Sequence, residues 1–125
     1  RMENDLLDVF EAAVDGRLSD IQLSWTPRKA VTVVLAAGGY PDSYRKGDVI
    51  TGIDEAEALP DVTVFHAGTK AVDGQVVTNG GRVLNVTALG DTFADAIDHA
   101  YEAVGRISWE GMTYRRDIAA RVRDR

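Results

Sequence analysis

The 125-residue sequence contains no cysteine, which excludes disulfides, a thiolate nucleophile and a cysteine-based zinc site. It also lacks any apolar run near the roughly 18 residues of a membrane-spanning helix, and its N-terminal residues show no signal-peptide pattern. Its 14 basic residues are outnumbered by 20 acidic ones, and the net charge of -6 disfavours a general nucleic-acid binder. These absences predict a soluble cytoplasmic domain that binds neither membranes nor nucleic acids. A small anionic ligand is still compatible, because local charge can oppose the net charge.

Residues typical of catalysis are also sparse. The two histidines, His66 and His99, are far apart and have no metal-ligand spacing such as H-E-x-x-H. No serine lies in a G-x-S-x-G motif, and the Gly38-Gly39 pair lacks the lysine spacing of a phosphate-binding P-loop. We therefore predict no catalytic residue and no metal site in this chain. His99 is expected to have a structural or surface role, whereas His66 ends a predicted strand, where side chains often face a cleft.

Apolar residues recur at three- and four-residue intervals over residues 3–15 and 92–104, which predicts two helices ending at Gly16 and Gly105. A short final helix is predicted after Met112. The Asp73-Gly74 pair predicts a hairpin between two β-prone segments. Further strands are predicted at residues 21–25, 31–36, 61–66 and 82–89, with a short strand or turn at 49–53. We therefore expect an α+β fold in which a mainly antiparallel meander of strands is covered by the long second helix.

Two glycine-rich loops are the most specific local features. Gly38-Gly39-Tyr40-Pro41 follows an apolar strand, and Asn79-Gly80-Gly81-Arg82 precedes another. The second loop has two interpretations: a hairpin turn whose glycines supply positive φ beside a solvated arginine, or an anion site formed by bare N–H groups and a guanidinium. Arg115 and Arg116 are open to the same choice between an anion clamp and solvated helix-end arginines.

Several longer motifs occur in a fixed order along nearly the whole chain. They are residues 33–41 (VVLAAGGYP), 46–52 (KGDVITG), 65–69 (FHAGT), 78–84 (TNGGRVL), 86–92 (VTALGDT), 100–104 (AYEAV) and 110–118 (EGMTYRRDI). In this order they resemble the C-terminal part of the glycinamide ribonucleotide synthetases, the phosphoribosylamine-glycine ligases of the ATP-grasp class. An ordered set of this length is far more specific than one glycine loop.

The resemblance implies an ATP-dependent carbon-nitrogen ligase of purine biosynthesis, which joins glycine to 5-phosphoribosylamine through a glycyl phosphate. It implies that ATP and Mg²⁺ or Mn²⁺ are held by upstream residues absent from this sequence, and that the isolated chain binds no cofactor and is inactive. Residues 1–16 would be a helix from the end of the ATP-grasp domain, and residues 17–125 the C-terminal domain. The expected partners are the upstream ATP-grasp and N-terminal domains of the same polypeptide, and a small phosphoribosyl substrate.

The resemblance also assigns expected site residues. Gly80, Gly81 and Arg82 match the position that holds the sugar phosphate in related enzymes, and Asn85 stands where the family usually carries glycine. The remaining candidates for cleft or anion contacts are Gly38, Gly39, Tyr40, Pro41, His66, Arg115 and Arg116. Two alternatives are open: a stand-alone small-anion-binding or interaction module without catalysis, and the equivalent domain of a biotin-carboxylase-type ligase. The purine-type motifs disfavour the second.

Overall fold

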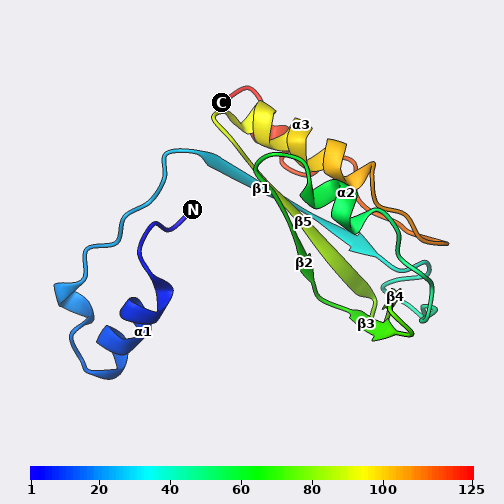
Figure 1. Cartoon of the computed structure of the whole chain (residues 1–125). Helices are drawn as coiled ribbons and strands as arrows, with labels where there is room; N and C mark the ends of the chain where they lie inside the picture. Colours follow the sequence, from blue (N-terminus) through cyan, green and yellow to red (C-terminus); the bar gives the residue numbers. More distant parts are fainter.

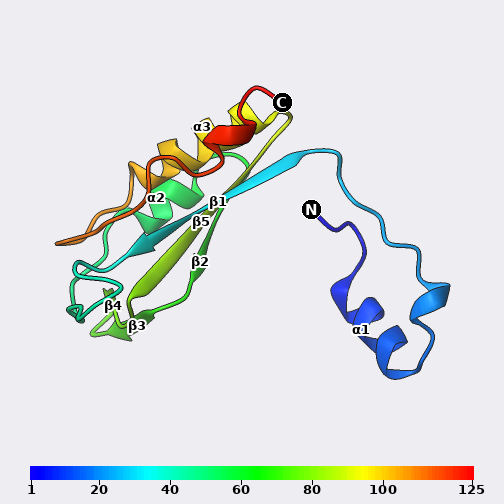
Figure 2. The same cartoon turned by 180° about the vertical axis from the view of Figure 1, so that it is seen from behind.

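The computed structural model describes residues 1–125. Figure 1 shows an α+β domain that begins with strand β1 (Lys29–Ala36), and a separate N-terminal segment that carries helix α1 (Leu6–Val14). The view from behind in Figure 2 shows the same separation, with α1 on the opposite side of the sheet from helix α3 (Phe93–Val104). The α+β fold with a covering helix, predicted from the sequence, is confirmed.

The main sheet has three antiparallel strands in the order β1-β5-β2. Strand β5 (Arg82–Gly90) is central and pairs with β1 on one side and with β2 (Val62–His66) on the other. The expected meander is therefore wrong, because the last strand of the sheet inserts between the first two. Helix α2 (Ile53–Glu57) lies in the long connection that carries the chain from β1 to β2.

A second, two-stranded sheet is formed by β3 (Thr69–Val72) and β4 (Gln75–Thr78). Its turn is Asp73-Gly74, with both residues at positive φ, as the predicted hairpin requires. In contrast, Asn79-Gly80 is not a hairpin turn, because β4 and β5 pair with different strands. Gly80 and Gly81 do not have positive φ, so the need for glycine there has another cause.

Helix α3 covers one face of the sheet. Thr92 caps its first turn by accepting a hydrogen bond from Asp95 N–H, while Asp95 accepts one from Thr92 N–H. Burying a valine or leucine side chain contributes ~1.5–3 kcal/mol, so the residues beneath the helix account for much of the stability of the fold. The buried sheet residues on this side are Val31, Val33, Leu35, Val64, Leu84, Val86 and Ala88.

The opposite face of the sheet is uncovered. Val34 and Phe65 flank Asn85 in one cross-strand row, and their side chains are 38% and 53% exposed. In the next row the Thr32 and Thr87 hydroxyls are 2.8 Å apart. This face has no helix of the described chain packed over it.

A β-bulge interrupts β5 near its start. Leu35 pairs with Leu84, but Ala36 pairs with Arg82, so Val83 is an extra residue between the two pairs. The Val83 carbonyl accepts hydrogen bonds from both Ala67 N–H and Gly68 N–H, at 3.0 Å each. The bulge therefore shifts the side-chain alternation of β5 by one residue at this point.

The N-terminal segment differs most from the prediction. Asp5 caps α1, which ends before Gly16, and η1 (Leu18–Asp20) follows. The strand predicted at residues 21–25 is absent apart from one bridge between Trp25 and Met2, because no neighbouring strand is present to complete a ladder. Large apolar side chains are exposed along this segment, namely Leu6, Leu7, Phe10, Val14, Leu18, Leu23 and Trp25.

Arg28 connects this segment to the domain. Its guanidinium donates to both carboxylate oxygens of Asp61 at 2.7 Å, and its Nε lies 3.2 Å from Asp91 Oδ1. These contacts raise the pKa of Arg28 above its usual range, chiefly through the hydrogen bond to Asp61, and lower the pKa of Asp61. At the other end of the chain, the predicted final helix is a single turn, η2 (Ala120–Val122).

Candidate functional site

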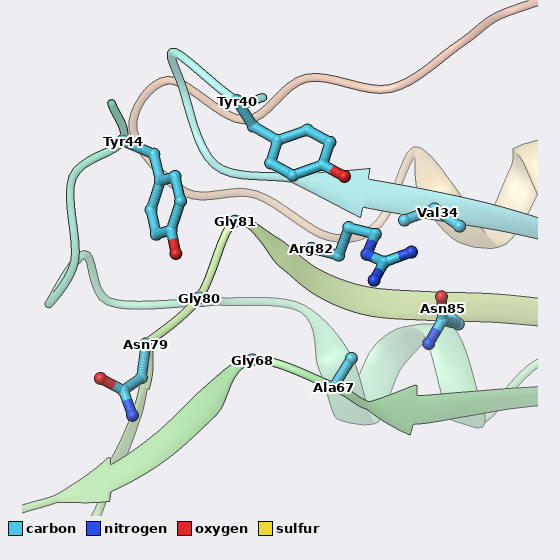
Figure 3. A pocket seen from close by; sticks show the side chains of 10 residues that line it. All are labelled: Val34, Tyr40, Tyr44, Ala67, Gly68, Asn79, Gly80, Gly81, Arg82 and Asn85. Atoms are coloured by element: carbon cyan, nitrogen blue, oxygen red, sulfur yellow. The ribbon is translucent and has the colours of Figure 1, made fainter. Parts of the chain in front are cut away.

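A pocket of about 530 Å³ lies where the uncovered face of the sheet meets the two glycine-rich loops (Figure 3). It is assembled from β1, β5, the loop after β1, the turn after β2 and the β4–β5 connection. Its lining residues are Val34, Tyr40, Tyr44, Ala67, Gly68, Asn79, Gly80, Gly81, Arg82 and Asn85. The structure therefore brings together Tyr40, predicted from the first loop, with all of the second loop.

Glycines allow the pocket walls to approach one another. A Cβ atom on Gly68 would lie 2.5 Å from Arg82 O and 2.8 Å from Gly80 Cα. A Cβ atom on Gly81 would lie 2.4 Å from Tyr40 Cδ2. Close packing, of Gly80 against the Gly68 backbone and of Gly81 against the tyrosine rings, is thus the reason for the glycines in the second loop, and positive φ is not.

Arg82 is the cation of this pocket. It is exposed, and its guanidinium forms no ion pair or hydrogen bond, unlike Arg28, Arg45, Arg115 and Arg123. The backbone N–H groups of Gly80 and Gly81 donate to no protein acceptor. A guanidinium without an ion pair, next to N–H groups without protein acceptors, is a donor set of the kind that can bind a small oxyanion.

Tyr40 and Tyr44 form an aromatic wall beside Arg82. Their ring centroids are 6.4 Å apart with a 54° angle between the planes, and the side chains are 40% and 38% exposed. Both rings pack against Gly81, and Figure 3 shows the Tyr40 hydroxyl directed toward the Arg82 side. The rings therefore limit the pocket on the side of the first glycine loop.

The first loop contributes in other ways besides Tyr40. Gly39 has a φ of 92°, and a Cβ there would lie 2.2 Å from Ser43 O, so this turn needs glycine. Gly38 packs against Gly111 and lines a different cavity, with Arg45, Asp48 and Glu110. Pro41 does not line the pocket. The turn thus presents Tyr40 while the other predicted residues of this loop shape its backbone.

Arg115 and Arg116 lie in other surroundings. Arg115 donates to both oxygens of Asp117, at 2.8 and 2.6 Å, and this raises the pKa of Arg115 and lowers that of Asp117. It lines a neighbouring pocket of about 420 Å³ that also includes Tyr40 and Arg82. Arg116 lies over the Tyr114 ring, 5.1 Å from its centroid. Arg115 is near Arg82 but already paired, so Arg82 is the better anion donor.

Neither histidine lines the pocket. His66 Nδ1 is 2.9 Å from Thr69 Oγ1, and its side chain is exposed at the end of β2. His99 Nδ1 lies 2.9 Å from the Leu89 carbonyl, a contact that joins α3 to β5. His99 thus has a structural contact of the kind expected for it.

Several lining residues were not predicted from the sequence. Tyr44 follows Tyr40 by four residues, and a second aromatic in the same loop was a usable signal. Val34 and Asn85 reach the pocket only through the strand register and the bulge, which no local pattern reveals.

No cluster of three or more His, Cys, Asp or Glu side chains is arranged to hold a metal ion. None of the helices has the length and apolar character needed to cross a membrane.

The fold and the pocket together define a small α+β domain with a donor-rich pocket suited to a small anion. The family model described as "Phosphoribosylglycinamide synthetase, C domain" matches residues 30–121. A phosphoribosylamine–glycine ligase of Vibrio parahaemolyticus is 51% identical over 122 residues, which cover 98% of this chain and 28% of the relative. One from Rhodopirellula baltica is 50% identical over 120 residues, 95% of this chain and 28% of the relative.

The crystal structure of a Thermotoga maritima phosphoribosylamine–glycine ligase superposes with a TM-score of 0.70 at 41% sequence identity, covering 88% of this chain and 27% of that one. The chain therefore belongs to the phosphoribosylglycinamide synthetase C-domain family. It spans about 28% of the length of the curated relatives that it matches.

Proposed function

We propose that this chain is the C-terminal domain of a phosphoribosylamine–glycine ligase, and that its pocket forms one wall of the substrate cleft. The ligase joins glycine to 5-phosphoribosylamine at the expense of ATP in purine biosynthesis. The identity to ligases over 98% of the chain supports the assignment of the reaction. The unpaired Arg82 beside the free N–H groups of Gly80 and Gly81 is the observation that carries the role in binding.

Arg82 is proposed to bind the phosphate of the phosphoribosyl substrate. Its guanidinium can donate two parallel hydrogen bonds to phosphate oxygens, which adds direction to the attraction between the charges. The net charge of the chain is -6, so this local cation must act against a repulsive background. Charge-assisted hydrogen bonds contribute ~1.5–3 kcal/mol each, enough to offset repulsion that water largely screens.

The chemistry of the reaction is proposed to reside in the longer polypeptide. ATP and Mg²⁺ or Mn²⁺ would be held by its upstream residues, and the described chain would position the substrate without a catalytic group of its own. The cysteine-free composition suits the reducing cytoplasm in which we place the enzyme. The isolated chain is accordingly expected to show no glycine-dependent ATP hydrolysis, and measurable hydrolysis would contradict this division of roles.

Residues 1–16 are proposed to belong to the upstream ATP-grasp domain, with residues 17–125 forming the C-terminal domain. Val14 is 87% exposed and Phe10 58%, although both lie on a helix with apolar residues at helical spacing. An apolar helix face of this kind needs a surface to pack against, and the domain that begins with β1 does not supply one (Figures 1 and 2). The family model matches residues 30–121, so residues 1–16 lie outside the matched domain.

The proposed phosphate site is testable by NMR on the 125-residue chain. Ribose 5-phosphate should shift the amide signals of Gly80, Gly81 and Arg82, and Arg82→Ala should abolish these shifts. Arg106→Ala is the matched control, since it removes an exposed arginine on the far side of the sheet, paired only with Glu102. Shifts that persist in Arg82→Ala, or that disappear equally in Arg106→Ala, would show that Arg82 is an ordinary solvated arginine.

The length of the native polypeptide separates this proposal from a stand-alone anion-binding or interaction module. Immunoblotting of cell extract with an antibody to the C-terminal domain should detect a polypeptide several times longer than 125 residues. A native product of 125 residues would favour the module.

A further inference from the structure

We propose that Asn85 makes the Arg82 pocket selective for sugar phosphates over simple phosphates, by binding a hydroxyl group of the sugar whose phosphate lies on Arg82. The inference rests on the proposed phosphate site and adds a second point of recognition to it. It concerns a side chain that the glycine-rich motifs do not include.

The bulge at Val83 brings Asn85 to the side of the sheet that Arg82 occupies. Residues three apart in a regular strand point to opposite faces. Here Asn85 pairs with Val34 and Arg82 pairs with Ala36, and these two partners are only two residues apart on β1. Arg82 and Asn85 therefore share a face, with backbones about 7 Å apart along the strand.

The surroundings of Asn85 provide no reason for an amide at this position. It lies on the central strand between Val34 and Phe65, and asparagine is depleted in strands. Its side chain has no hydrogen-bond partner in the protein and lines the pocket (Figure 3). The amide therefore offers two donors and an acceptor to a ligand, as a hydroxyl group requires.

The pocket has room for a phosphorylated sugar, because its volume is about 530 Å³. Arg82 extends between Val34 and Asn85 in Figure 3, and the Tyr40 ring forms the wall beside it. A pentose 5-phosphate carries hydroxyls several ångströms from its phosphate, a spacing that two points on one strand face can match. The apolar C–H face of the ring would pack on Tyr40, while its hydroxyls reach Asn85.

The test compares two ligands of equal charge by NMR titration of the 125-residue chain: methyl phosphate, which lacks hydroxyls on its carbon, and ribose 5-phosphate. The parent chain should bind ribose 5-phosphate about fivefold more tightly, the effect of one net hydrogen bond. Asn85→Ala should remove this preference and leave methyl phosphate affinity unchanged. Asn85→Val, which keeps a strand-forming residue, should behave identically if the amide is the cause.

Gln75→Ala is the matched control, because Gln75 is an exposed amide without a protein partner and lies on β4, outside the pocket. It should retain the preference. A preference that survives in both Asn85 variants, that is lost equally in Gln75→Ala, or that is absent from the parent chain would overturn the role of Asn85. Arg82→Ala should weaken the binding of both methyl phosphate and ribose 5-phosphate. If both ligands still bind normally to Arg82→Ala, or neither binds to the parent, the phosphate site itself is wrong, and the sugar site falls with it.

Discussion

Gly81 sets how closely the β4–β5 connection can approach the loop of Tyr40 and Tyr44. An added Cβ would lie 2.4 Å from Tyr40 Cδ2 and 3.0 Å from Tyr44 Cε1. The φ angle of Gly81 is not positive, so this position requires space and not unusual backbone freedom. The absence of a methyl group on Gly81 therefore allows both tyrosine rings to lie against the β4–β5 connection.

Gly81→Ala is expected to displace both tyrosine rings and to lower the free energy of unfolding by about 1–3 kcal/mol, the usual cost of overpacking. Urea unfolding measures the change. Gly105→Ala is the control, because its φ is -65° and its Cβ would approach Glu102 O only to 3.3 Å. Equal stability of Gly81→Ala and the parent, with unchanged tyrosine ring resonances, would contradict the steric argument.

Among the elements, α3 owes its start to the reciprocal hydrogen bonds between Thr92 and Asp95. Thr92→Ala should lower the free energy of unfolding by ~1 kcal/mol, as the loss of a helix cap does. Thr92→Ser retains a capping hydroxyl and should lose much less. Thermal unfolding followed by circular dichroism should show a decrease in melting temperature of about 4 °C for the alanine variant only.

The same cap predicts a pH dependence. Hydrogen bonds from the Thr92 side chain and backbone lower the pKa of Asp95, so the folded state holds the ionised carboxylate more firmly than the unfolded state does. This stabilisation is complete above the ordinary pKa of aspartate and is lost as the pH falls through the lower folded-state pKa. Thr92→Ala should therefore lower the free energy of unfolding by the full amount near neutral pH and by less in acid. An equal decrease in the free energy of unfolding at neutral and at acid pH would contradict this linkage.

Elements with local signals were predictable, and those that depend on distant partners were not. Helix α3 has its cap, its apolar face and Gly105 within one short stretch, and the Asp73-Gly74 hairpin is equally local. The strand predicted at residues 21–25 alternates correctly but has no neighbour, so the pattern alone does not form a strand. The central position of β5 depends on pairings that sequence order does not indicate.

The candidate site also combines residues that a local motif predicts with residues that depend on distant strand pairing. The glycines and arginine of the second loop form a contiguous motif, and the structure places them in one pocket. Val34 and Asn85 belong to that pocket because of a strand register and a one-residue bulge. A regular strand would have predicted that Asn85 faces away from Arg82. Long-range pairing thus decides part of the site.

For the whole molecule, the separation of the N-terminal segment predicts that it contributes little to the stability of the domain. A shortened chain beginning at Arg28 should melt within about 2 °C of the full chain, because surface changes away from packed groups have small effects. It should also bind less of a hydrophobic dye, since the exposed side chains of α1 are gone. Differential scanning calorimetry and dye fluorescence measure the two effects.

A chain beginning at Val33 is the control for that comparison. It removes the first half of β1, whose Val31 is buried, and should unfold. If the chain beginning at Arg28 loses as much stability as this control, the segment before β1 is part of the domain after all.

The ion pairs of Arg28 also determine how the domain responds to mechanical load. Strand β1 lies at the edge of the sheet, so tension on its N-terminal end would unzip it from β5 one hydrogen bond at a time. Arg28 precedes the first residue of the ladder and forms ion pairs with Asp61, just before β2, and with Asp91, just after β5. A pull transmitted through the preceding segment must break these ion pairs before it acts on the hydrogen bonds between β1 and β5. The load is thereby shared with the ends of β2 and β5, and the hydrogen bonds of the edge strand β1 are protected.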